Sequence, residues 1–388
     1  MSAIRPIAFY LPQFHPTPEN DEWWGTGFTE WRNVVKALPR FNGHYQPHLP
    51  ADLGFYDLRL METRQSQAEL AKDHGIYGFC YYHYWFSGRR LLNRPFDEVL
   101  SSQQPDFPFC LCWANHNWTR RWDGLEQDML VRQEYSFDDD LEHIRWLAKA
   151  FSDKRYIKVG GKPLFLIFCS SQIPDSRSTL DIWRTEANRL GIGELFICAV
   201  ESPVTPMPDI VGGGYDAAIE FQPRWHDAPL NLKRDRYWNW ARKLGLSSLA
   251  FRDNHIWDYR EFAERMMSLA EPTYLRFRCV MPSWDNSARR ENEAFIVDNS
   301  TPDVYERWLR SVAEKSLTEP DLEGLMFINA WNEWAEGNHL EPCQKWGRAY
   351  LEATQRVVRS LNSITPFNAK DEHNNNNLQP ARAFTAGG

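Results

Sequence analysis

The 388-residue chain lacks an excess of basic residues and lacks long apolar runs. Its formal net charge is −8 at pH 7, whereas a general nucleic-acid-binding protein presents a basic face. Apolar runs such as LFLIFC at residues 164–169 are far too short to span a bilayer. We therefore expect neither a nucleic-acid partner nor a membrane span.

Several catalytic motifs are also absent. Cys110 and Cys112 are separated by one residue, so they do not form the CxxC pair of a zinc ribbon or a redox motif. The two histidines of HYQPH (residues 44–48) are four positions apart, but the prolines disfavour a helix and no HExxH pairing exists. The glycine run VGGGY at 211–215 lacks the Lys of a phosphate loop, and no G-x-S-x-G elbow is present. We expect no catalytic metal and no cofactor.

The beginning of the sequence gives no sign of export. MSAIRPIAFYLPQFHP holds one Arg, and three prolines interrupt its apolar part, which is typical neither of a signal peptide nor of an anchor. The chain has seven cysteines, an odd number, and six of them lie in apolar, strand-like runs. Buried free thiols in a reducing compartment explain this pattern. The sequence thus predicts a cytoplasmic protein.

Aromatic residues are abundant. The 18 Trp, 15 Tyr and 23 Phe make 14% of the chain, more aromatic bulk than core packing alone needs. The hydrophobic content of 43% and the charged content of 25% are ordinary for a globular protein. The aromatic excess therefore indicates a binding role for some of these rings.

Short apolar runs alternate with amphipathic helical patterns along most of the chain. The predicted helices include residues 57–75, 181–191, 259–270 and 304–315. The predicted strands are residues 6–13, 76–85, 108–117, 162–169, 195–202, 215–223, 277–286 and 325–334. Eight such strands, each followed by a helical segment, predict a parallel (β/α)₈ TIM barrel.

Two segments exceed a minimal barrel. Residues 14–56 form a long, Pro- and Gly-punctuated excursion after the first strand, with few helical signals. The Trp-, Arg- and Asn-rich stretch 224–256 predicts a second long loop or small helical subdomain after strand six. We assign residues 1–365 to one catalytic domain and the polar, low-complexity residues 366–388 to a disordered tail.

Unusual polar residues collect at the ends of the predicted strands, where a TIM barrel places its active site. Asn, His, Gln and carboxylate side chains beside Trp suit a sugar, whose C–H face packs on a ring while its hydroxyls need two-way hydrogen-bond partners. The strand ends hold Gln13, His15, His83, Trp85, Asn115, His116, Asn117, Glu201, Glu220, Gln222, Trp284, Asp285, Asn286, Asn332, Glu333 and Glu336.

Glu333 and Glu336, in FINAWNEWAEGNHLEP, are the leading catalytic candidates. On an extended strand they would point to opposite faces, about 10 Å apart along the chain. If the chain turns helically after Trp331, they fall on one side with Cβ atoms about 5–6 Å apart. Glycosidases place two carboxyl groups about 5–9.5 Å apart. A capping or salt-bridged pair of glutamates is the alternative.

The segment NEWAEGNHLEP closely resembles the signature of glycoside hydrolase family 99, the endo-α-mannosidases and endomannanases. The rest of the chain more closely resembles the WbsX-like relatives of that family, which occur with bacterial polysaccharide and O-antigen biosynthesis. This resemblance runs from residue 8 to 342 through AFYLPQFHP, GFTEWRNV, HYQPHLP, YYHYWF, WANHNWTRRWDG, WDNSARR and NAWNEWAEGNHLEP.

The resemblance implies a (β/α)₈ barrel and a retaining mechanism through a 1,2-anhydro sugar, with Glu333 as the base and Glu336 as the acid. Ala335 stands where the hydrolases have His, which puts the substrate contact at that position in doubt. The strand ends and the matching motifs together predict these substrate-binding residues: His15, Glu30, Trp31, His44, Tyr82, His83, Trp85, Trp113, Asn115, Asn117, Arg121, Glu220, Trp284, Asp285, Arg290, Trp331, Asn332 and Trp334.

Three functions remain open. The first is a glycoside hydrolase acting on α-glycosidic linkages. The second is a WbsX-type glycosyltransferase of polysaccharide, O-antigen or lipopolysaccharide biosynthesis, because the same acid pair can pass a glycosyl group to another sugar. The third is a non-catalytic sugar-binding barrel, against which the intact Glu333 and Glu336 argue. The expected partner is a glycan or a lipid-linked saccharide.

Three arginine pairs follow predicted strand ends, in WFSGRR, NWTRRW and NSARR. Solvated or Asp-paired arginines are one interpretation. The other is that some of them, above all Arg121 and Arg290, bind an anionic part of the substrate through bidentate contacts.

Overall fold

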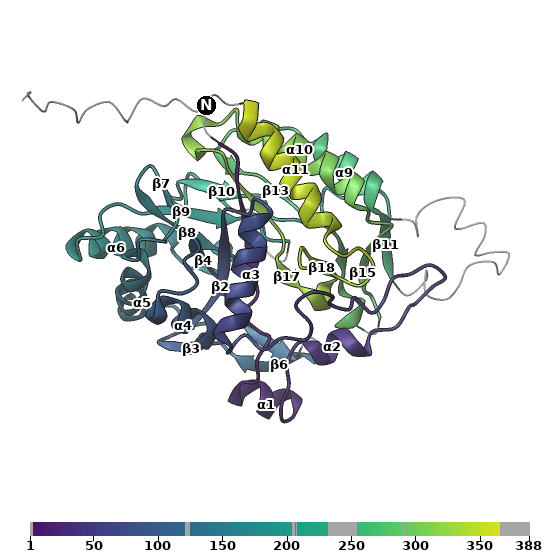
Figure 1. The fold of residues 1–388 in the computed structure, drawn as a ribbon. Coiled ribbons are helices and arrows are strands. Elements are labelled where there is room, and N and C mark those ends of the chain that lie inside the picture. Colours follow the sequence, from purple (N-terminus) through teal and green to yellow (C-terminus); the bar gives the residue numbers. More distant parts are fainter. Residues whose placement is uncertain are drawn as a thin grey trace, which may run out of the picture.

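The structure is a computed structural model that describes residues 3–120, 125–203, 206, 208–231, 254–290 and 292–364. Its centre is a parallel β-barrel with helices packed around the outside (Figure 1). The strands of the barrel are β1 (Arg5–Tyr10), β2 (Gly78–Phe86), β4 (Phe109–Trp113), β8 (Lys162–Ile167), β9 (Phe196–Val200), β10 (Ala217–Ile219), β12 (Arg276–Phe277), β13 (Cys279–Val280) and β16 (Leu325–Ile328).

The ring closes through a strand in two pieces. β12 pairs with β10, and β13 pairs with β16, while only Arg278 separates β12 from β13. β16 in turn pairs with β1. Residues 276–280 therefore act as the seventh of eight strands, and the predicted (β/α)₈ barrel is confirmed.

Outer helices follow the strands, and three of them begin at a side-chain N-terminal cap. Asp175 and Asp258 accept hydrogen bonds from backbone N–H groups of the first helical turns of α6 and α9, and Ser136 does the same for α5. The helices are α3 (Met61–Asp73), α4 (Arg94–Ser102), α5 (Phe137–Phe151), α6 (Ser176–Arg189), α9 (Tyr259–Met267), α10 (Pro302–Ser316) and α11 (Ala349–Ile364). No helix in the described ranges is both long and apolar enough to cross a membrane.

Aromatic rings fill the barrel. Phe9 of β1 packs against Tyr82 of β2, Phe221 after β10 and Phe327 of β16, with ring centroids 5.3–5.7 Å apart. Because these residues come from different sides of the ring, they form a layer across the interior. All seven cysteines are free and buried, as predicted.

Long connections lie at the carboxyl ends of the strands. The connection between β1 and α3 holds two short helices, α1 (Pro18–Trp24) and α2 (Trp31–Lys36), in an excursion whose sequence has few helical signals. After β4 comes the hairpin β5 (Trp118–Arg120) and β6 (Leu125–Val131). Most of the predicted loop 224–256 and the predicted tail 366–388 lie outside the described residues.

Two further connections carry the motifs of interest. The seventh strand is followed by β14 (Trp284–Asp285) and the 3₁₀ turn η4 (Asn286–Ala288), and β14 joins β15 (Phe295–Asp298) and β11 (His255–Asp258) in a small sheet. The eighth strand is followed by β17 (Asn332–Glu333), the 3₁₀ turn η6 (Trp334–Glu336) and β18 (Asn338–His339).

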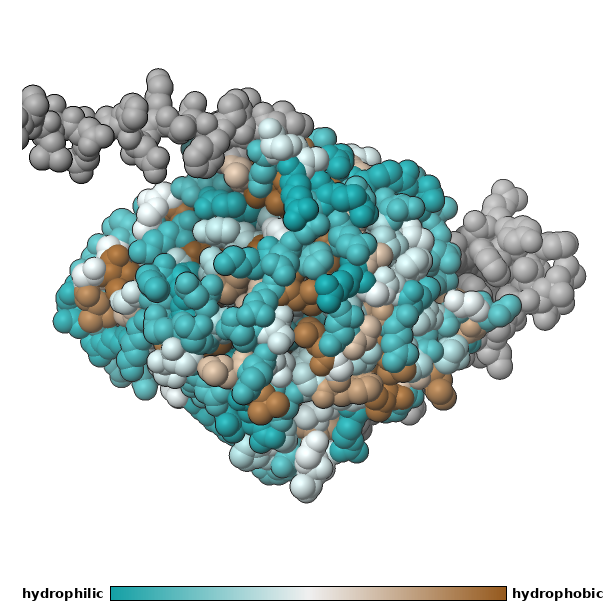
Figure 2. Space-filling model, viewed as in Figure 1, coloured by the Kyte–Doolittle hydropathy of each residue, from teal (hydrophilic) through white to brown (hydrophobic). Residues whose placement is uncertain are grey.

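The visible surface is mainly hydrophilic, with scattered apolar patches (Figure 2). Several exposed large apolar side chains belong to the connection between β1 and α3, namely Val35, Leu38, Phe55 and Leu60. This connection also supplies one wall of the candidate active site.

Candidate active site

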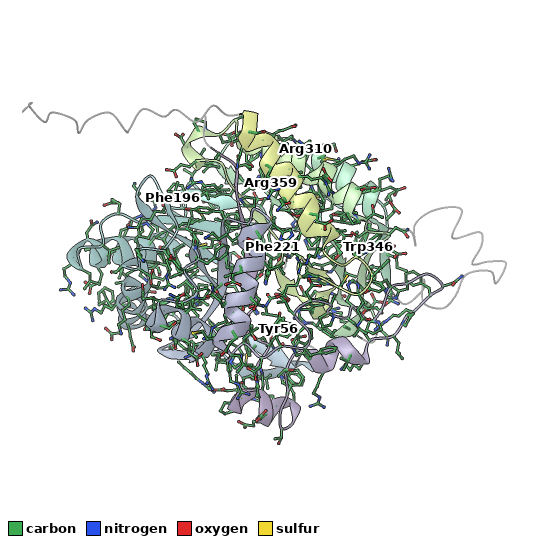
Figure 3. All side chains as sticks on the ribbon, viewed as in Figure 1. Tyr56, Phe196, Phe221, Arg310, Trp346 and Arg359 are labelled. Atoms are coloured by element: carbon green, nitrogen blue, oxygen red, sulfur yellow. The ribbon has the colours of Figure 1, made fainter. Side chains whose placement is uncertain are left out.

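Segments far apart in the sequence meet at the carboxyl end of the barrel. The turn η6 contacts α2, η4 and β14. Figure 3 labels Phe221 near the middle of the barrel and Tyr56 towards the side on which α1 and α2 lie. The connections after the first, seventh and eighth strands therefore build one site.

The chain turns tightly between Glu333 and Glu336. Glu333 caps the 3₁₀ turn η6, in which Glu336 is the last residue, and Gly337 follows with φ of 57°. An added Cβ on Gly337 would lie 3.0 Å from Cβ of Asp285, so glycine suits this position for space as well as for its left-handed backbone. The structure thus shows the turned alternative, with both carboxylates reaching the same partner.

That partner is Arg289, whose guanidinium contacts three carboxylates. Its Nη1 donates to Glu336 Oε1 at 2.5 Å and its Nη2 donates to Glu333 Oε2 at 3.2 Å. Its Nε donates to Oε1 of Glu30, the N-cap of α2, at 2.9 Å. One arginine therefore joins the connections after strands one, seven and eight.

Burial dominates the electrostatics of this cluster. Loss of solvent, followed by the charge of Glu336, raises the pKa of Glu333 to about 8 against the opposing effect of Arg289. Burial also raises the pKa of Glu336, again opposed by Arg289. Desolvation lowers the pKa of Arg289, but the charges of Glu30, Glu336 and Glu333 outweigh it, so its pKa lies well above the ordinary value. Arg289 stays charged, and the glutamate pair can hold a proton near neutral pH.

Aromatic rings extend away from the acids. Burial followed by the charge of Glu333 raises the pKa of Tyr82 and of Tyr84, which places both β2 tyrosines near the acid pair. Trp118 packs edge-on against Tyr84 at 5.1 Å, and Trp23 of α1 packs against Trp118 at 5.8 Å. We call Trp23, Tyr82, Tyr84 and Trp118 the aromatic strip. Tyr82 and Tyr84 are buried, whereas Trp23 and Trp118 are partly exposed, so the tryptophans are the rings of this strip that a sugar can reach.

The tryptophans of the NAWNEW segment lie behind the acids and are fully buried. Trp334 stacks on His339 at 3.8 Å and donates its Nε1–H to Glu341 Oε2 at 2.6 Å. The side-chain amide of Asn332 accepts a hydrogen bond from the backbone N–H of Leu11 and donates one to its C=O. These residues support the turn rather than face an open site, and Trp31, whose ring lies 5.6 Å from Trp334, belongs to the same layer.

His44 and Asp285 are partners of each other. His44 Nδ1 accepts from the backbone N–H of Arg40 at 3.0 Å, so Nε2 carries the hydrogen that it donates to Asp285 Oδ2 at 2.6 Å. Burial raises the pKa of Asp285, but interactions that include the hydrogen bonds from His44 and Ser287 outweigh it, and the pKa is lowered. The pair fixes β14 beside η6. The ring of Trp284, the residue before Asp285, packs against the ring of Trp225 at 5.9 Å.

Other predicted residues lie in separate clusters. His83 and Trp85 of β2 point to α5, where His83 contacts His143 at 3.0 Å and Trp85 donates to Asp139 at 2.8 Å. Trp113 donates to the carbonyl of Trp85 at 3.2 Å. These three residues pack the barrel against its outer helices.

Three further predicted residues have local partners, and a fourth is a buried histidine. Asn115 pairs with the backbone N–H and C=O of Cys169, and Asn117 accepts from the backbone N–H of Gln133. Glu220 accepts from Gln222 and from the N–H of Cys279. His15 is buried, its ring nitrogens have no hydrogen-bond partner among the described residues, and burial lowers its pKa to about 4.

Of the two arginines predicted to bind an anion, Arg290 forms no hydrogen bond to the carboxylate cluster within the described residues. Arg290 donates to the carbonyl of Glu293 at 3.4 Å and lies 6.0 Å from the ring of Phe295. Arg121 lies outside the described residues. No group of three or more His, Cys, Asp or Glu side chains in the described part of the chain could hold a metal ion.

A model of the WbsX glycosyltransferase family matches residues 6–354. The chain therefore belongs to the WbsX family. The curated relatives are the WxcX proteins of two strains of Xanthomonas campestris pv. campestris, each 42% identical over 353 residues, which are 91% of this chain and 49% of theirs. This WbsX chain thus spans about half the length of the curated relatives it matches.

Solved structures share the fold of this WbsX protein. A GH99 endo-α-mannosidase from Bacteroides thetaiotaomicron superimposes with a TM-score of 0.56 at 14% identity, covering 92% of this chain and 98% of that one. A glycoside hydrolase-like protein superimposes with the same TM-score and identity, and the match covers 92% of this chain and 94% of that one. At this identity the likeness shows a common barrel.

Three residues of the candidate site were not predicted from the sequence, namely Trp23, Tyr84 and Trp118, and Arg289 was predicted only as a member of the pair Arg289–Arg290. Each stands inside or beside a segment that had been singled out, and Arg289 is the immediate neighbour of Arg290. Tyr84 could have been found, because alternate residues of a strand share one face and Tyr82 was already a candidate. No local signal separates Arg289 from Arg290.

Proposed function

We propose that this WbsX protein is a carbohydrate-active enzyme that acts at an α-glycosidic linkage with Glu333 and Glu336. The observation that supports it best is the pair of glutamates, one buried and one partly buried, held by one arginine beside the aromatic strip. Burial keeps a proton available on the pair, as general acid–base chemistry requires. Ring faces next to the pair suit a sugar.

The proposed reaction has two steps. In the first, the carboxylate of Glu333 takes the proton of the sugar 2-hydroxyl, the 2-oxygen bonds to C1, and the bond from C1 to the leaving oxygen breaks. Glu336 gives its proton to that oxygen. In the second, Glu336 takes a proton from water or from an acceptor hydroxyl, whose oxygen attacks C1. The C1–O2 bond breaks and Glu333 returns the proton, so the two inversions give retention.

Transfer to another sugar is the second candidate, and the description of the family as glycosyltransferases favours it. The same second step transfers the glycosyl group when an acceptor hydroxyl replaces water. The substrate is then a glycan or a lipid-linked saccharide of polysaccharide, O-antigen or lipopolysaccharide assembly. The buried free cysteines support a cytoplasmic location. A barrel that only binds sugar is disfavoured by the intact acid pair.

Variants of the two glutamates test the proposed roles. With natural glycan, Glu336→Gln loses about 10²–10⁴-fold in kcat, because an alkoxide leaves poorly without a proton. An activated aryl α-glycoside needs no such proton, so Glu336→Gln recovers much of the first step on it. Glu333→Gln fails on both substrates, since the 2-hydroxyl stays un-ionised. Glu220→Gln, a buried glutamate in another cluster, is the matched control.

Two results would contradict the proposal. Turnover of a 2-deoxy substrate with retention would exclude the anhydro sugar, and identical profiles of the two Gln variants would exclude the division of roles. Product analysis with glycan alone and with glycan plus a nucleotide-sugar separates the two candidates. Release of reducing sugar without a nucleotide donor supports hydrolysis, and strict dependence on the donor supports transfer.

A further inference from the structure

The third carboxylate of the cluster is too deeply buried to touch a substrate. The side chain of Glu30 is 0% exposed, its Oε1 accepts from Arg289 Nε at 2.9 Å and from Asn33 Nδ2 at 3.2 Å, and its Oε2 has no hydrogen-bond partner within the described residues. Glu30 therefore acts on the site through its hydrogen bond to Arg289 and through the effect of its negative charge on Glu333 and Glu336.

The charges of the cluster do not balance. If Glu30, Glu333 and Glu336 are all ionised, three negative charges face the single positive charge of Arg289. Such an excess in a buried site is costly, so a proton is retained on the coupled glutamate pair. Among the described residues, the other titratable groups that act on the pair include the uncharged Tyr82 and Tyr84 of β2 and the guanidinium of Arg290.

The geometry decides which glutamate carries this proton. Arg289 lies 2.5 Å from Glu336 but 3.2 Å from Glu333. The side chain of Glu336 is 21% exposed and that of Glu333 only 8%. Arg290 adds a weaker favourable charge on the side of Glu336. Glu336 is therefore the ionised partner in the substrate-free protein, and Glu333 holds the proton.

We propose that Arg289 and Glu30 are positioning residues that decide how Glu333 and Glu336 share one proton. The inference rests on the proposed function, in which Glu333 must be the base and Glu336 the acid. The substrate-free arrangement is the reverse of that. The position from which a leaving oxygen would accept the proton of Glu336 is taken by Arg289 Nη1.

Substrate entry resolves this conflict. When the leaving oxygen displaces Nη1 from Glu336, the ionised form of Glu336 loses its best partner. The proton then leaves Glu333, which becomes the base, and bonds to Glu336, which becomes the acid. No proton enters from solvent. Arg289 Nε stays hydrogen-bonded to Glu30, so the guanidinium turns towards Glu333 rather than leaving the site. The pair thus reaches its reactive form only when the site is occupied.

The test is a carboxyl titration of the substrate-free protein. Infrared difference spectra of protein labelled with ¹³C-glutamate follow protonation, and Glu333→Gln and Glu336→Gln assign the bands. Glu30→Gln removes a negative charge that opposes ionisation of both glutamates, so both titrations move to lower pH. Arg289→Gln removes the favourable charge, so both move to higher pH by about 1 unit or more, with the larger change at Glu336.

Opposite shifts are the signature, because purely structural damage would not move the two variants in opposite directions. Shifts of the same sign, or no shift in Glu30→Gln, would overturn the inference. Arg289→Lys keeps the charge and leaves the titrations near their wild-type positions, and Arg290→Gln gives a smaller upward shift at Glu336. Glu30→Gln is nearly isosteric and decides the question even if Arg289→Gln does not fold.

The titration needs no turnover, so it tests the proton sharing separately from the proposed function. Opposite shifts in a protein that cleaves and transfers no glycan would uphold the proton sharing and reject the activity. In an active protein, the pH profile of kcat/KM moves down in Glu30→Gln and up in Arg289→Gln. An active protein whose profile stays fixed in both variants would reject the proton sharing alone.

Discussion

Glu341 is a buried acid that supports the candidate active site from behind. It is 2% exposed and accepts hydrogen bonds from Tyr56 at 2.7 Å, Gln67 at 2.6 Å and Trp334 at 2.6 Å. Burial raises its pKa from 4.5 to about 7, although these donors oppose the rise. Folding stability must therefore depend on pH through this side chain.

The sign and size of the effect follow from the two pKa values. Because the folded value lies above the unfolded one, the stabilisation is fully present below about pH 4.5 and is lost as the pH rises through about 7. Each pH unit between them corresponds to about 1.4 kcal/mol, so the whole loss is about 3 kcal/mol. Glu341→Gln cannot ionise, and we expect it to escape this loss.

Glutamine fits the network without stranding a donor. Its amide oxygen can accept from Tyr56 and Trp334, which both donate to Oε2. Its NH₂ then faces Gln67, whose amide can flip because its other partner, the hydroxyl of Tyr10 at 2.7 Å, can accept as well as donate. The variant therefore isolates the charge from the hydrogen bonds.

Urea unfolding of the wild type and Glu341→Gln at pH 5 and pH 8 measures the effect. The free energy of unfolding of the wild type should fall relative to the variant by most of the 3 kcal/mol between these pH values. Glu352→Gln, on an exposed face of α11, is the control. A difference that does not change with pH would refute the reasoning, because it would mean that Glu341 is ionised in the folded protein throughout.

Three further outcomes are expected. Gly337→Ala should lower the free energy of unfolding by about 1–2 kcal/mol, because φ is 57° and left-handed backbone is unfavourable for alanine; an unchanged urea midpoint would contradict this. Trp118→Ala should raise KM for glycan about tenfold, with a smaller change in kcat, since a sugar loses a ring face; exposed Phe137→Ala is the control. Arg121→Gln and Arg290→Gln should raise KM for an anionic substrate far more than for a neutral analogue, and equal effects would reject an anion site.

The sequence alone determined the barrel. Near-continuous apolar runs between amphipathic segments can be buried on both faces only in a covered parallel sheet, and all eight predicted runs overlap the strands of the ring. It also determined the acid pair, because Glu333, Glu336 and the glycine that ends their turn are neighbours in the chain. The order of residues along short stretches of the chain was sufficient to predict both.

Only the tertiary structure decided which side chains share the site. Along β2, Tyr82 and Tyr84 face the acids while His83 and Trp85 face α5, and this depends on how the strand is set in the ring. Arg289, and not Arg290, contacts Glu333, Glu336 and Glu30, because three long connections come together above the barrel at that residue. The contact between Glu30 and Arg289 joins residues 259 positions apart, and no local pattern encodes it.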